Sequence, residues 1–127
     1  MSTKTSSVRR TSDHFEPDAN LDPQAQRRLR GHLEQIDYIA YVSNREVVGA
    51  TLNKIDGKAF QRLGVAAAQA RTRWVATALT AAESGQPLSR AQVDQLAELR
   101  RSYEEISDVY EAMRRLVERG YLAYEGQ

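Results

Sequence analysis

The stretch that decides the fold is QLAELRRSYEEISDVYEAMRRLVERG, which runs from Gln95 to Gly120. Its apolar residues recur at alternating spacings of three and four, the period of a helix that lies along another helix. Charged side chains fill most other positions, so the apolar stripe needs a facing surface from the rest of the chain or from a second copy. The residues of this stripe are Leu96, Leu99, Tyr103, Ile106, Tyr110, Met113 and Val117.

The composition is that of one folded domain. The chain has 127 residues, of which 41% are hydrophobic and 28% charged, enough for one modest core. Its formal net charge of +1 gives no overall attraction to nucleic acid or to a membrane. Residues 1–20 are rich in Ser, Thr and charged side chains and have little to bury. We therefore expect a disordered tail over residues 1–20 and a single helical domain over residues 21–127.

The sequence also limits the compartment and the chemistry. It contains no cysteine, which excludes a disulfide framework, a thiolate zinc site and a cysteine nucleophile. No run of about 18 apolar residues occurs, so we expect no membrane partner and a cytoplasmic location. Only His14 and His32 offer imidazoles, and neither has a set of further ligands at helical spacing. We therefore expect no metal site and no cofactor.

The first expected helix begins at Asp22-Pro23, where Asp caps free amides and Pro takes the first helical position. Ser43-x-x-Glu46 resembles a capping box, so one alternative is that this helix ends and a new helix begins near Ser43. A β-hairpin is the alternative for residues 38–52, which are rich in β-branched and aromatic side chains around a polar connection. The pattern favours helix. Its apolar row consists of Leu29, Leu33, Ile36 and Ala40.

A second helix is expected over residues 58–83, which contain nine alanines and only one glycine, Gly64. Asp56-Gly57 is a turn or a capping point before it, and residues 84–87 end it. So many alanines allow close approach to neighbouring helices, so this helix belongs in the middle of a bundle. The side chains expected to anchor or widen its buried face are Phe60, Leu63, Trp74, Val75, Leu79 and Ala82.

The third helix begins after an N-cap at Ser89 and ends at Gly120. Residues 121–124 form a short apolar tail that either docks on the helices or makes a strand. Because the connections are short, consecutive helices pack antiparallel. The sequence therefore predicts an all-α, antiparallel up-down bundle of three long helices, or four if the first one breaks near Ser43.

Carboxylates on the third helix suggest one alternative function. Glu104, Asp108 and Glu111 fall on one helix face, close enough to share a cation such as magnesium. The segment Glu105-x-x-Asp108 resembles the second half of the metal motif of the all-α nucleotide pyrophosphohydrolases of the MazG type. That resemblance implies a magnesium-dependent hydrolase. The family pairs the motif with an earlier Glu-x-x-Glu, and this sequence offers only Glu34-x-x-Asp37.

A second alternative comes from residues 88–97 followed by residues 109–122. They resemble the helix, recognition helix and wing entry of winged-helix transcription regulators of the MarR and PadR kind, which implies DNA binding. The sequence departs from the family in two ways. Residues 100–105 continue the apolar period where a turn is required, and the first turns of the supposed recognition helix carry acidic side chains that oppose a phosphate backbone.

The function that the pattern favours is a small non-enzymatic protein–protein interaction module: an adaptor, a chaperone-like binder or a regulator. Its partner is another protein or a second copy of the chain, as in a coiled-coil homodimer, and nucleic acid stays the alternative partner. Binding would bury the apolar stripe of the third helix. The Arg and Glu side chains at the edges of the stripe would determine which partner binds and in which register the two helices align. The residues predicted to bind the partner are Leu99, Tyr103, Ile106, Tyr110 and Met113.

Overall fold

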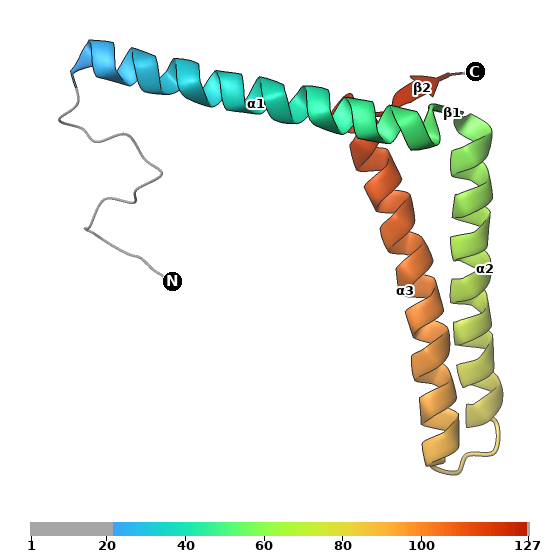
Figure 1. Ribbon diagram of the computed structural model, residues 1–127. Helices are drawn as coiled ribbons and strands as arrows, with labels where there is room; N and C mark the ends of the chain where they lie inside the picture. The colour runs from blue at the N-terminus through green and yellow to red at the C-terminus, as the bar shows by residue number, and fades with distance from the viewer. Residues whose placement is uncertain (1–21, 127) are drawn as a thin grey trace. The chain divides into compact units, whose positions relative to one another are not determined.

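The computed structural model describes residues 22–126 and is shown in Figure 1. The predicted tail over residues 1–20, with His14 in it, lies outside these residues. The described chain divides between Val42 and Ser43 into two units, which are treated separately below, and the prediction of one domain stays a prediction. The elements are α1 (Pro23–Leu52), β1 (Lys54–Asp56), α2 (Gly57–Ala82), α3 (Arg90–Glu118) and β2 (Ala123–Glu125).

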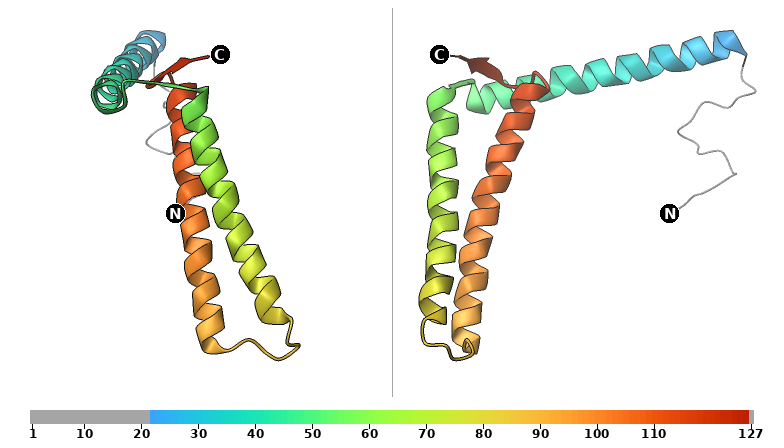
Figure 2. Two further views of the ribbon diagram at one scale, coloured as in Figure 1. Left: turned by 90° about the vertical axis from the view of Figure 1, so that its right-hand side faces the viewer. Right: turned by 180° about the vertical axis from the view of Figure 1, so that it is seen from behind.

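The predicted all-α class is confirmed. Three long helices make up most of the described residues, and two of them, α2 and α3, pack against each other. They lie side by side and run in opposite directions, as Figures 1 and 2 show. The short connection between them, residues 83–89, allows this antiparallel hairpin, as the sequence predicted.

Helix α1 begins where the sequence predicted, because the Ala25 amide donates to Oδ1 of Asp22 at 2.7 Å. It continues through Ser43 without a break, so neither the restart near Ser43 nor the hairpin alternative is formed. The polar connection there lacks the glycine that tight hairpin turns favour, whereas a helix needs no such residue. The helix ends at Leu52, and the next residue, Asn53, has a φ of 60° and donates its amide to the Gly49 carbonyl at 2.9 Å.

Side-chain caps start both helices of the hairpin. Asp56 caps α2, because its Oδ1 accepts from the Ala59 amide at 3.1 Å. Ser89 caps α3, because its hydroxyl accepts from the Gln92 amide at 3.1 Å. The Gln92 side chain accepts in turn from the Ser89 amide at 2.8 Å, which completes a capping box. These local contacts fix where the two helices begin.

The open end of the hairpin is closed by a pair of parallel strands. Gly120 adopts a φ of 78°, and the chain then turns into β2, which pairs with β1 so that Ile55 lies opposite Tyr124. Nζ of Lys54 lies 3.3 Å from Oε2 of Glu125 across the pair. Both alternatives for residues 121–124 are formed in part, because Leu122 is buried and the strand begins at Ala123. The partner strand β1 was not predicted.

The second unit has a very small core. Leu122, 2% exposed, is the one hydrophobic side chain that is fully buried among residues 22–126. It follows the turn at Gly120, whose carbonyl accepts a hydrogen bond from Nη1 of Arg45 at 2.7 Å. This bond ties the last turns of α1 to the end of α3. The side chains between α2 and α3 keep some exposed area, because two helices cover only part of each other.

Removal of the Ser89 cap tests how much this local contact contributes. Ser89→Ala leaves the amide at the third helical position without its partner, so we expect the free energy of unfolding to fall by about 1 kcal/mol. Urea unfolding followed by circular dichroism measures the change. Ser102→Ala is the matched control in the middle of α3. Equal stability of the two variants would contradict a stabilising cap.

Candidate protein-interaction site

The predicted stripe of α3 lies against α2 through aromatic contacts. The ring of Tyr103 stacks on Trp74 with centroids 6.2 Å apart and planes at 21°. The guanidinium carbon of Arg71 lies 5.9 Å from the centroid of the same Tyr103 ring. The ring of Tyr110 meets Phe60 edge to face at 5.6 Å and 81°. The stripe is therefore a packing surface within the chain.

This packing covers the stripe only in part. Each residue that the sequence predicted to bind a partner is half-buried, and none of them is fully buried. A single helix, α2, shields one side of the stripe, so the other side keeps contact with solvent. The structure thus brings together, on one α3 face, Leu99, Tyr103, Ile106, Tyr110 and Met113.

Small residues on α2 let the two helices approach closely beside Tyr110. A Cβ built on Gly64 would lie 3.6 Å from the Tyr110 ring, an ordinary van der Waals contact. A shallow hollow of about 170 Å³ opens here between the helices. It is lined by Gly64, Ala67, Ser107, Tyr110 and Glu111. The close contact shown here is made at Gly64. That the alanines of α2 allow close approach stays a prediction.

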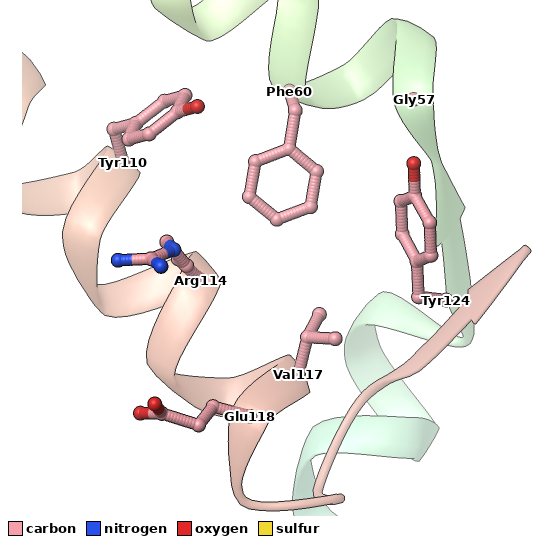
Figure 3. A pocket seen from close by; sticks show the side chains of 7 residues that line it. All are labelled: Gly57, Phe60, Tyr110, Arg114, Val117, Glu118 and Tyr124. Atoms are coloured by element: carbon pink, nitrogen blue, oxygen red, sulfur yellow. The ribbon is translucent and has the colours of Figure 1, made fainter. Parts of the chain in front are cut away.

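A larger hollow lies at the strand end of the hairpin, where Tyr124 of β2 faces Phe60 of α2 (Figure 3). The two ring centroids are 5.9 Å apart with planes at 67°. The hollow has a volume of about 470 Å³ and is open to solvent. Its walls are mostly apolar, and Arg114 and Glu118 add a cation and a carboxylate from α3. The full lining is Gly57, Phe60, Tyr110, Arg114, Val117, Glu118 and Tyr124.

Sequence reasoning missed this hollow. It treated Phe60 as a core anchor and Tyr124 as part of an apolar tail, and nothing local in the sequence joins the two. Only the pairing of β1 with β2 brings Tyr124 to the start of α2. The available indication was the presence of aromatic residues in a tail too short to form a helix of its own.

The expectation that Val75, Leu79 and Ala82 widen the buried face of α2 was wrong. Val75 is 47% exposed and Leu79 is 66% exposed, and Ala82 is also on the surface. The ring contacts of α2 to α3 come instead from Phe60 and Trp74.

The chemistry of the two alternative functions is not assembled in the described chain. Among residues 22–126 there is no group of three or more His, Asp or Glu side chains placed to hold a metal ion. Glu104 instead lies 3.9 Å from Nε of Arg100 on the same helix face. A winged helix needs a turn before its recognition helix, whereas α3 runs unbroken from Arg90 to Glu118.

Comparisons with known proteins leave the family open. No protein-family model, no curated protein sequence and no solved structure matches this chain. Over residues 22–126, none of the three helices combines the length and the apolar character needed to cross a membrane. The arguments on function therefore rest on the site itself.

Substitution of Gly64 tests the close approach of α2 to Tyr110. Gly64→Ala fits the available space, so removing a mid-helix glycine should raise the free energy of unfolding by about 0.5–1 kcal/mol. Gly64→Leu should lower it by about 1–3 kcal/mol, because the larger side chain forces the helices apart. Urea unfolding followed by the fluorescence of Trp74, the one tryptophan in the chain, measures both.

The matched control is Gly31→Leu, because a Cβ on Gly31 meets nothing within 4 Å. This variant should leave the unfolding of the hairpin unchanged. If Gly64→Leu behaved like Gly31→Leu, the close contact between Gly64 and Tyr110 would be refuted.

Proposed function

We propose that this chain is a small non-enzymatic protein–protein interaction module, an adaptor or regulator, which binds a helical segment of a partner protein along the α2–α3 hairpin. The observation that carries the proposal is the partial burial of the α3 stripe. Tyr103 and Tyr110 of the stripe pack on α2, yet each of the seven side chains keeps exposed area. The composition leads us to place this module in the cytoplasm.

The physical basis is the small core of the hairpin. In a self-contained domain, burial of apolar side chains must offset the loss of conformational entropy on folding. Here Leu122 alone is fully buried among residues 43–126. A third helix laid on the seam between α2 and α3 would bury the open side of the stripe, as amphipathic helices do in hydrophobic grooves. Binding would therefore stabilise the module as well as the complex.

The ends of the seam indicate which partner fits. The open hollow around Phe60 suits a large apolar or aromatic side chain, since three aromatic rings line it. Arg114 and Glu118 lie at its α3 side and favour a partner with charges of both signs beside its apolar row. The partner segment we expect is an amphipathic helix with apolar residues at spacings of three and four and one aromatic anchor near its end.

Selection from a displayed library of helical peptides tests this proposal on the purified chain. Selected peptides should carry an apolar row of helical period. Their binding should weaken about tenfold or more with Tyr110→Glu, because a carboxylate then enters the apolar seam. Fluorescence anisotropy of labelled peptides measures the dissociation constants.

The matched control is Val109→Glu, since Val109 neighbours Tyr110 but is 50% exposed and lies off the stripe. It should leave peptide binding unchanged. Circular dichroism and Trp74 fluorescence check that both variants remain folded, and Tyr110→Ala serves if the charged variant does not. Peptides that bind both variants as well as the wild-type chain would refute the seam as the binding surface.

A further inference from the structure

The first described unit contains a helix with an uncovered apolar row. In the α1 segment Pro23–Val42, two members of this row are well exposed, Leu33 at 48% and Ile36 at 58%, whereas Leu29 is half-buried. An isolated helix in water gains little stability from propensity alone and usually depends on packing of its apolar face. This row lies on α1, whereas the proposed partner-binding stripe lies on α3. The two surfaces therefore need separate partners.

The spacing of the row is that of a coiled-coil seam. Leu29, Leu33, Ile36 and Ala40 follow one another at intervals of four, three and four residues. Tyr38, which is 67% exposed, lies on the opposite side of the helix, away from this row. The seam is narrow and suits a single partner helix.

Charges beside the seam indicate which helix fits. Arg30 follows Leu29 and Asp37 follows Ile36, so the two charged residues occupy the same edge of the seam. They are seven residues apart, about 10 Å along the axis, which is too far for a pair within one helix. Neither forms an ion pair within residues 22–126. This edge therefore presents one cation and one carboxylate for a partner.

A second copy of α1 in the antiparallel direction satisfies both charges. When Leu33 lies opposite Ile36 of the second copy, Leu29 lies opposite Ala40, so that a large residue faces a small one. The same register places Arg30 beside Asp37 of the second copy. Because the arrangement has twofold symmetry, the ion pair occurs twice.

A parallel pair leaves these charges unmatched. In a parallel coiled coil, a residue on one edge of the first helix faces a residue on the opposite edge of the second helix, and the sequence numbers of the two differ by five. Arg30 would then face Ala25, and Asp37 would face His32. The antiparallel direction therefore gives both residues a partner of opposite charge, whereas the parallel direction gives Asp37 only an imidazole and Arg30 none.

We propose that two copies of this chain associate through their α1 helices, as an antiparallel coiled coil centred between Leu33 and Ile36, with two Arg30–Asp37 ion pairs. This inference is independent of the peptide-binding function proposed for the hairpin. It assigns α1 to self-association and leaves the α2–α3 seam for a different protein.

Exchange of the two charges tests the proposal in the full chain. Sedimentation over a range of concentrations should show a dimer for the wild type. Arg30→Asp or Asp37→Arg alone should weaken the dimer about tenfold, because each puts like charges together at both symmetric contacts. The double variant Arg30→Asp/Asp37→Arg should restore the dimer to within about threefold of the wild type. High salt should reduce the effect of the single changes.

Two controls separate this surface from others. Arg27→Asp makes the same charge change away from the seam and should leave the dimer unchanged. Tyr110→Glu should also leave it unchanged, and a loss of the dimer there would assign self-association to the hairpin. A monomeric wild type, or a double variant that stays as weak as the single ones, would overturn the proposal, whatever the peptide selection shows.

Cross-linking tests the direction of the helices. The chain contains no natural cysteine, so single cysteines can be introduced without interference. A mixture of Leu33→Cys and Ile36→Cys chains, one carrying a mass tag, should oxidise mainly to the mixed disulfide in the antiparallel register. Predominant self-linked Leu33→Cys pairs would indicate a parallel coil and refute the register.

Discussion

The contact between the α3 stripe and the small-residue face of α2 is the interaction on which the rest of the second unit depends. It contains two aromatic pairs, Trp74 with Tyr103 and Phe60 with Tyr110. Between them Gly64 lets the helices approach. The strands and the aromatic hollow exist only because this contact brings the start of α2 beside the end of α3. Since two helices leave each stripe residue partly exposed, the same contact that forms the hairpin also provides its candidate binding surface.

Local features of the sequence predicted the helices and most of their ends. Asp22, Asp56 and Ser89 cap the helices as expected, and Gly120 ends α3 with a positive φ. These signals act over three or four residues, so they can be recognised without the fold. The sequence left open a break of the first helix near Ser43, and this break is not formed. A capping box is also compatible with a helix interior when the residues before it are helical too, as those of α1 are.

Features that depend on distant residues could not be predicted. The pairing of Ile55 with Tyr124 joins segments with no shared local pattern, and the aromatic hollow follows from that pairing. The exposure of Val75 and Leu79 depends on what covers α2, and periodicity identifies an apolar face without identifying its neighbour. The five predicted binding residues were placed correctly on one face. Their role as partner contacts remains a prediction.

The strand pair has a consequence for the order of folding. Lys54 and Glu125, which meet across it, are separated by 71 residues in the sequence, whereas α2 and α3 are joined by the short connection at residues 83–89. Once the hairpin has formed, bringing the two strands together costs less loop-closure entropy. We therefore expect the hairpin to form from its connection outwards and the strands to pair last. Of the residues that line the aromatic hollow, only Tyr124 comes from these strands, and it is 46% exposed. We therefore expect this one wall to adjust to a ligand while the walls from α2 and α3 stay in place.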